Sequence, residues 1–140
     1  MAQRISELMT QDLRTLRPQA TLVEAARVMR DSDIGDVLIV DDDGTLAGMI
    51  TDRDMVVRAL ADGRDPSACT VGDVCSPELV TVTPNMEAGD AVRLMSRHAV
   101  RRLPVVEDGK PVGVLSIGDL AIERDSDSAL ADISAAPSNN

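Results

Sequence analysis

The sequence contains no phenylalanine, tyrosine or tryptophan, although 44% of its 140 residues are hydrophobic. A core must therefore be built from valine, isoleucine, leucine, methionine and alanine, and a flat ligand could stack only on aliphatic carbon. The length suits one compact domain or two small domains that pack together.

Basic residues are fewer than acidic ones: the chain has 14 Lys and Arg against 24 Asp and Glu, which gives a net charge of -10. Such a charge repels phosphate backbones, so we expect no nucleic-acid partner. No apolar run reaches the length of a membrane span, and the stretch from Met1 to Asp12 carries charges where a signal peptide has its apolar run. We therefore expect no membrane association and a cytoplasmic location.

Cysteine and histidine are scarce, with Cys69, Cys75 and His98 as the only three. They are too few for a zinc set, and no P-loop, dinucleotide glycine pattern or nucleophile with its base is present, so we expect no catalytic or metal site. The run from Asp41 to Gly44 lacks the spacing of a calcium loop and indicates a hairpin turn. A disulfide between the cysteines is sterically conceivable and stays open, although cytosolic proteins usually keep such thiols reduced.

The chain does contain an internal repeat. Pro18 aligns with Pro84 and, after one deletion, Gly48 aligns with Gly113, with other identities in the same order. Each copy predicts an extended piece, a helix, two strands joined by a turn, and a second helix. In the first copy these are 13–16, 22–30, 37–40, 46–50 and a helix from residue 52.

The order βαββα, found twice, predicts an α+β fold in which each half covers the apolar sheet face of the other. We expect 5–65 and 66–124 to be two halves of one body related by pseudo-two-fold symmetry. The segment 125–140 is rich in Ser, Ala, Asp and Asn, which predicts a disordered tail.

A glycine-led motif closes the second strand of each copy, as Gly48-Met49-Ile50-Thr51-Asp52-Arg53-Asp54 and as Gly113-Val114-Leu115-Ser116-Ile117-Gly118-Asp119. With these motifs the chain resembles, over about residues 5 to 123, a pair of cystathionine beta-synthase (CBS) domains, or Bateman module. The resemblance implies an α/β sandwich and a homodimer, in which two modules form a flat disc held by helices around residues 52 to 61 and 118 to 123.

The resemblance implies a regulatory function without catalysis or a required cofactor. An adenine nucleotide (AMP, ADP or ATP) or S-adenosylmethionine would bind in the cleft between the repeats and signal to an unidentified protein target in trans. The alternative is a ligand-free scaffold or stress-response protein that acts through dimerisation and would gain a redox input if its cysteines pair. Bound nucleotide distinguishes the two.

In the family, the motif's hydroxyl meets a phosphate or ribose and its aspartate accepts ribose hydroxyls, which implies these roles for Thr51, Asp54, Ser116 and Asp119. The chemistry is reasonable, since a carboxylate can accept two vicinal hydroxyls and the N–H groups at a helix start favour an anion. The same spacing also forms a capping box that begins a helix without any ligand. Both interpretations stay open.

The resemblance adds positions from the first strand and from the entry to the second strand: Thr15, Leu16, Gly35, Asp36 and Val37 in one copy, and Thr81, Val82, Val100, Arg101, Arg102 and Leu103 in the other. Here the copies differ, because Arg101-Arg102 aligns with Gly35-Asp36 and Leu38 replaces the family proline that Pro104 retains. An anionic phosphate prefers arginine to aspartate, so we predict one competent site near Arg101 or Arg102 and one weak or empty site. Alternatively, the arginines belong to a solvated strand edge or to a dimer salt bridge.

Overall fold

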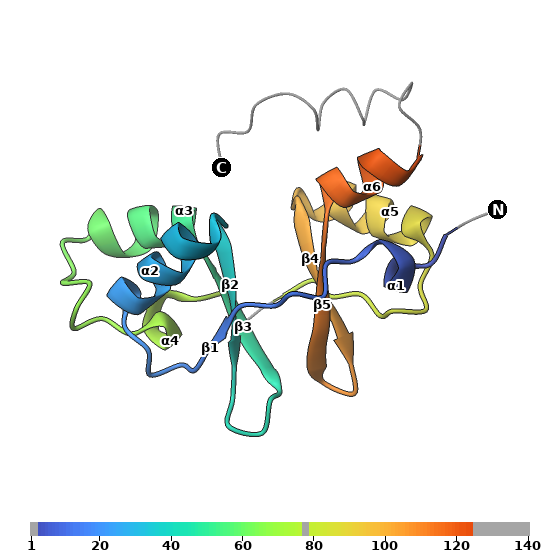
Figure 1. Ribbon diagram of the computed structural model, residues 1–140. Helices are drawn as coiled ribbons and strands as arrows, with labels where there is room; N and C mark the ends of the chain where they lie inside the picture. Colours follow the sequence, from blue (N-terminus) through green and yellow to red (C-terminus); the bar gives the residue numbers. More distant parts are fainter. Residues whose placement is uncertain (1–2, 77–78, 125–140) are drawn as a thin grey trace. The chain divides into compact units, whose positions relative to one another are not determined.

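The computed structural model describes residues 3–76 and 79–124, with side chains described up to residue 120. The chain forms two compact units, shown in Figure 1. Of the described residues, those within 14–79 form one unit, and those of 3–13 and 80–124 form the other. Each unit is an α+β body with its own hydrophobic core, which confirms the predicted fold class.

The unit 14–79 is built on a three-stranded sheet in the order β1-β2-β3, in which β1 is parallel to β2 and β2 is antiparallel to β3. A π-helix, η1, continues α3 directly. The elements are β1 (Thr15–Leu16), α2 (Leu22–Ser32), β2 (Asp36–Val40), β3 (Leu46–Thr51), α3 (Asp52–Asp54), η1 (Met55–Leu60) and α4 (Val71–Val74).

The other unit repeats this plan around an antiparallel pair of strands, β4 and β5. Val82 forms a parallel bridge to Val105 of β4 at the place where the first unit has β1. The elements are α1 (Ile5–Leu8), α5 (Ala88–His98), β4 (Arg102–Glu107), β5 (Lys110–Ser116) and α6 (Ile117–Arg124).

A single substitution between the repeats explains why only the first unit has a named β1 strand. The N–H of Leu38 donates to the carbonyl of Arg14 at 3.1 Å and so extends the pairing of β1 with β2. Pro104 occupies the equivalent place in β4 and has no N–H to donate. The segment 79–82, which aligns with the extended piece 13–16 of the first copy, is therefore reduced to one bridge.

Apolar residues at helical spacing form the buried faces of the two longer helices. Leu22, Ala25 and Met29 are buried on α2, and α5 buries Ala88, Ala91 and Met95 in the same way. The hydroxyl of Thr21 accepts the N–H of Glu24 at 3.2 Å and so caps the start of α2. α2 continues to Ser32, two residues beyond the predicted end, and then stops at Asp33 in a left-handed conformation with φ 55°.

The compact units differ from the sequential division into 5–65 and 66–124, because each repeat begins with a helical turn that packs into the other unit. α1 comes from the start of the first repeat and buries Ile5 and Leu8 in the core of the unit that holds α5 and β4. α4, from the start of the second repeat, buries Val71 and Val74 in the unit 14–79. These four-residue turns are too short to show a helical period in the sequence.

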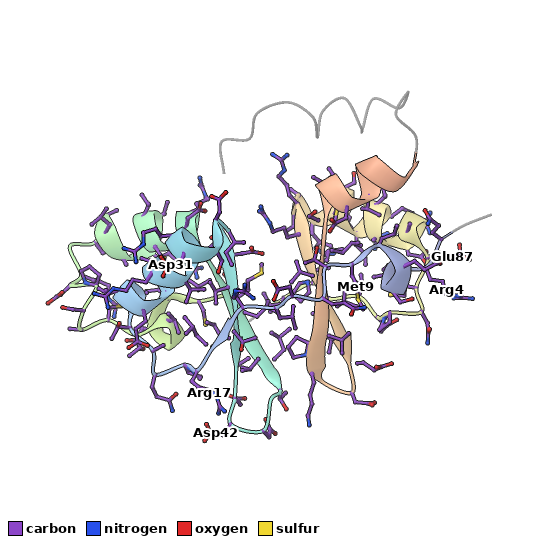
Figure 2. The ribbon with its side chains drawn as sticks, viewed as in Figure 1. Arg4, Met9, Arg17, Asp31, Asp42 and Glu87 are labelled. Carbon is purple, nitrogen blue, oxygen red and sulfur yellow. The ribbon has the colours of Figure 1, made fainter. Side chains whose placement is uncertain are left out.

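Each of these starting segments continues along the outer strand of the sheet that it joins. Thr10 exchanges two backbone hydrogen bonds with Val114 of β5, at 2.9 and 3.0 Å, and Ser76 pairs with Met49 of β3 in the same manner. Met9, labelled in Figure 2, lies on the first of these segments. No helix within residues 3–76 and 79–124 is long and apolar enough to cross a membrane. The predicted tail 125–140 lies outside the described residues.

Candidate functional site

The motif at the end of β3 forms a closed hydrogen-bonded box. The hydroxyl Oγ1 of Thr51 accepts the N–H of Asp54 at 3.0 Å, and Oδ2 of Asp54 accepts the N–H of Thr51 at 3.0 Å. Both residues are partly buried. The capping interpretation of these two residues is therefore confirmed, and it leaves the hydroxyl hydrogen of Thr51 and Oδ1 of Asp54 outside the box.

The second motif adopts the same geometry at the start of α6. Oγ of Ser116 accepts the N–H of Asp119 at 3.1 Å, and Oδ2 of Asp119 accepts the N–H of Ser116 at 2.9 Å. A Ser or Thr followed by an Asp at this spacing satisfies two of the backbone donors left over at a helix start. The two units therefore present the same polar group at the same point of their sheets.

The residues that lead into β2 and β4 lie beside the boxes, at the positions that the family resemblance adds. Asp36 pairs with Thr51 in the β2–β3 register, and Gly35 accepts the N–H of Asp52 at 2.9 Å. In the other unit, Arg102 pairs with Ser116 and Arg101 accepts the N–H of Ile117 at 2.9 Å. The structure thus brings Gly35-Asp36 and Arg101-Arg102 to equivalent positions.

The charge around the two boxes differs more than the sequence alignment suggested. Asp52 extends its carboxylate over Gly35, where an added Cβ would lie 3.1 Å from Oδ2. The edge of the unit 14–79 therefore collects Asp36, Asp52 and Asp54. The repeat equivalent of Asp52 is Ile117, so the other unit has Asp119 beside Arg101 and Arg102. Sequence reasoning missed Asp52, although the pairing of Asp52 with Ile117 in the aligned motifs carried the signal.

The other predicted contact residues differ in how far their side chains are exposed. The side chains of Val37, Val82 and Leu103 are at most 1% exposed and belong to the cores, so only their backbone can meet a ligand. Leu16 and Val100 pack against the cores from partly buried positions. Thr15 and Thr81 are exposed, next to the bridges that attach the first extended piece to each sheet.

Cys75 is a neighbour of the first box that sequence reasoning did not place there. A Cβ at Gly48 would lie 2.8 Å from its sulfur, and burial, followed by the negative charge of Asp54, raises the pKa of the Cys75 thiol. Cys69 is buried, and both cysteines are free thiols in the structure. A thiol with a raised pKa is a poor nucleophile at neutral pH.

The other polar candidates are structural. The amide of Gly44 donates to the carbonyl of Asp41 at 2.9 Å, and Gly44 adopts φ 86°, which confirms the hairpin turn. Arg17 forms an ion pair with Asp42 at this turn, and both are labelled in Figure 2. His98 ends α5 and is exposed. Among residues 3–76 and 79–124, no three or more His, Cys, Asp or Glu side chains gather as metal ligands would.

Known proteins support the resemblance over most of the chain. The CBS domain model matches residues 5–60 and 71–125. The CBS domain-containing protein YhcV of Bacillus subtilis is 41% identical over 134 residues, which cover 93% of this chain and 94% of that protein. Hypoxic response protein 1 of Mycobacterium tuberculosis is 40% identical over 101 residues, 72% of this chain and 71% of that protein.

Solved structures share the fold. The crystal structure of Hypoxic Response Protein I with two coordinated zinc ions has a TM-score of 0.81 and 33% identity, and the match covers 88% of this chain and all of that chain. The CBS domain pair of protein MJ0100, solved with 5-methylthioadenosine and S-adenosyl-L-methionine, has a TM-score of 0.79 and 23% identity, over 87% of this chain and 95% of that chain. The two matched segments and the 41% identity to YhcV over nearly the whole length of both chains show that this chain belongs to the CBS domain family and carries two copies of the domain.

Proposed function

We propose that this chain is a cytoplasmic, non-catalytic regulatory module that binds an adenine nucleotide or a related adenosyl compound at the edge formed by β4, β5 and α6. The observation that carries the proposal is the presence of Arg101 and Arg102 beside the Ser116–Asp119 box. This arrangement places two cations, a hydroxyl and a carboxylate at the ends of two paired strands.

The Ser116–Asp119 box does not use the hydroxyl hydrogen of Ser116 or Oδ1 of Asp119, and these are groups that can bind a nucleotide. Oγ of Ser116 accepts the amide of Asp119, so its own hydrogen can be donated to a phosphate or ribose oxygen. Oδ2 of Asp119 is used by the box, whereas Oδ1 can accept a ribose hydroxyl. The capping and ligand-binding interpretations are therefore compatible, because different atoms of the same two side chains serve each.

Electrostatics favour the unit with the arginines. A phosphate near Asp36, Asp52 and Asp54 would meet like charge, whereas one near Arg101 and Arg102 would meet opposite charge, and the guanidinium fork matches phosphate oxygens. We therefore propose one competent site per chain. The net charge of -10 repels anions from most of the surface, so two neighbouring arginines are needed to offset this repulsion locally.

The regulatory part of the proposal follows from the family, whose domains act generally as non-catalytic regulatory modules. A ligand regulates only if it binds two states of the protein with different affinity. We propose that the two states differ in how the module packs with a second copy of itself or with a protein target in trans. The exposed side chains of Val56, Val57 and Leu60 on η1 support packing against a second copy.

The absence of aromatic residues makes the first test simple, because the protein itself hardly absorbs in the near ultraviolet and co-purified adenine would be visible directly. Equilibrium dialysis with ATP, AMP and S-adenosylmethionine should then show retention of at least one ligand. We expect Asp119→Ala to weaken binding by about tenfold or more, the equivalent of one lost charge-assisted hydrogen bond. Asp54→Ala should leave binding nearly unchanged.

Asp73→Ala is the matched control for a change that only weakens a helix start. Oδ2 of Asp73 accepts the amide of Thr70 at 3.3 Å at the start of α4, in a box of the same type. This variant should lose helix capping and keep ligand affinity. Calorimetry should give one ligand per chain, and two ligands of equal affinity would contradict the single-site proposal.

A ligand-free scaffold is the second candidate, and the apolar surface of η1 is the observation that favours it. Val56 is 55% exposed and Leu60 65% exposed, which suits a protein interface more than a solvated helix. A flat near-ultraviolet spectrum with no retention of any of the three ligands would favour this candidate over the sensor.

A further inference from the structure

A sulfur atom packs on the leading glycine of each family motif. In the unit formed by 3–13 and 80–124, Sδ of Met9 lies so close to Gly113 that an added Cβ would be 2.6 Å from it. In the unit 14–79, Sγ of Cys75 takes the equivalent place and would lie 2.8 Å from a Cβ at Gly48. Met9 and Cys75 also align in the repeat. The two units therefore make the same contact, one through a thioether and the other through a thiol.

Met9 combines this contact with access from solvent. Gly113 is buried, whereas Met9 packs against the core of the same unit from a partly buried position (Figure 2). Met29 and Met95, by contrast, are at most 9% exposed. A small reagent in solution can therefore reach the side chain of Met9, and any change at its sulfur acts directly on the contact with β5.

The two equivalent sulfur atoms differ in how readily they are oxidised. A cysteine reacts with a peroxide as the thiolate. Burial, followed by the negative charge of Asp54, raises the pKa of the Cys75 thiol and so keeps it protonated at neutral pH. A thioether has no proton to lose, and its oxidation to the sulfoxide requires only access. Of the two contacts, the one made by Met9 is therefore the more sensitive to a peroxide.

Few contacts hold residues 9–10 to β5. The N–H of Thr10 donates to the carbonyl of Val114 at 2.9 Å, and the N–H of Val114 donates to the carbonyl of Thr10 at 3.0 Å. The sulfur of Met9 covers Gly113, the residue before Val114. α1 is anchored separately by its two buried side chains. Loss of the Met9 contact can therefore free residues 9–10 from the strand without unfolding α1.

We propose that Met9 is an oxidation site at which a peroxide releases residues 9–10 from β5. The sulfur lone pair attacks one oxygen of hydrogen peroxide, the O–O bond breaks, and the proton on the transferred oxygen passes to the leaving hydroxide, which departs as water. The thioether is thereby oxidised to a sulfoxide and the peroxide is reduced. The polar sulfoxide no longer packs on Gly113, and the edge of β5 loses its cover at Val114. The inference goes beyond the proposed function, because it requires no nucleotide, and it acts on the strand that leads to the Ser116–Asp119 box.

Hydrogen exchange after mild treatment with hydrogen peroxide tests the proposal in the full chain. Mass spectrometry should find the sulfoxide at Met9, and the amides of Thr10 and Val114 should then exchange about tenfold faster, the scale expected when part of the burial of a methionine is lost. Reduction by methionine sulfoxide reductases should restore the slow exchange. The amide of Ser76, which donates to the carbonyl of Met49 at 3.0 Å in the other unit, is the internal control and should not change.

Two leucine variants separate Met9 from the other methionines. Met9→Leu keeps an apolar side chain that cannot form a sulfoxide, so peroxide should no longer accelerate exchange at Thr10. Met86→Leu is the matched control, because it removes another partly buried methionine of the same unit and should keep the peroxide effect. Met9→Gln places a polar side chain of similar length at the contact and should give fast exchange without peroxide, which supplies a second test if leucine packs poorly.

Three results would overturn the proposal. The first is a sulfoxide at Met9 with unchanged exchange at Thr10. The second is a treated chain in which Met9 stays reduced while other methionines are oxidised. The third is equal acceleration at Thr10 and Ser76, which would show general unfolding in place of a local release.

Discussion

Gly48 and Gly113 show how single residues hold each starting segment against its sheet. A Cβ at Gly113 would lie 2.6 Å from the sulfur of Met9 and 3.1 Å from the carbonyl oxygen of Thr10. A Cβ at Gly48 would lie 2.8 Å from the sulfur of Cys75 and 3.0 Å from the carbonyl oxygen of Ser76. The glycine that leads each family motif therefore serves packing, because a neighbouring backbone approaches it closely.

At the residue scale, we predict that Gly113→Ala and Gly48→Ala each destabilise the protein by about 1–3 kcal/mol, the usual cost of forcing atoms into a packed site. Urea unfolding followed by circular dichroism measures the effect. Gly89→Ala is the control, since its Cβ would meet nothing closer than the Arg93 guanidinium at 3.7 Å and it lies within α5. It should be neutral or stabilising by up to about 1 kcal/mol. Equal losses in all three variants would contradict this role for the two glycines.

At the scale of elements, the start of α4 is stabilised by the ionised carboxylate of Asp73. Hydrogen bonds from Thr70 hold the pKa of Asp73 below its ordinary value of 3.8, and the nearby charge of Arg64 lowers it further. Hydrogen bonds from Ser67 lower the pKa of Asp65, just before α4, in the same way. When the pKa of a carboxyl group is lower in the folded state than in the unfolded chain, its contacts stabilise the fold fully at pH values above the pKa of the unfolded chain.

We therefore predict that the start of α4 loses stability in acid. The contribution of Asp73 should be fully present near neutral pH and should fade as the pH falls below about 4 toward the pKa of the folded state. The difference in unfolding free energy between the native chain and Asp73→Ala should consequently be smaller at about pH 2.5 than at about pH 6, as measured by urea unfolding at each pH. A difference that is constant with pH would show that the carboxylate charge has no part in the cap.

At the scale of the whole molecule, the starting segment of each repeat packs in the core of the other unit, and this packing decides where the chain can be divided. The core of the unit 14–79 includes Cys69, Val71 and Val74, all of which follow the boundary at 65. Each fully buried valine contributes about 1.5–3 kcal/mol, so losing two of them removes about 3–6 kcal/mol, a large part of the roughly 5–15 kcal/mol that stabilises a domain.

We accordingly predict that a fragment 14–79 is folded to a greater extent than a fragment 5–65 of nearly equal length. Amide exchange and circular dichroism of the two fragments would measure the difference, with slower exchange expected in β2 and β3 of the fragment 14–79. Val71→Ala within that fragment should reduce the difference, whereas Val57→Ala should not, because Val57 is 50% exposed. Slower exchange in the fragment 5–65 would show that the sequential repeat is the folding unit.

The sequence alone determined the features that depend on local pattern. The repeat, the apolar stripes of α2 and α5, the turn at Asp41 to Gly44 and the two capping boxes all follow from residue types at short spacing. The juxtaposition of Gly35-Asp36 and Arg101-Arg102 with these boxes could also be predicted, because strands joined in a hairpin bring their outer ends together. Whether the predicted contacts bind a ligand stays a prediction.

Only the tertiary structure decided which segments pack together across long stretches of chain. Ile5 and Leu8 are apolar in the sequence, yet nothing local indicates that they join a core built largely from residues after 80. The roles of Met9 and Cys75 against the motif glycines depend on the same long-range contact. Loop closure and burial set such contacts, and their free energy comes from surfaces that meet only in the folded chain, so no periodicity within a short window can reveal them.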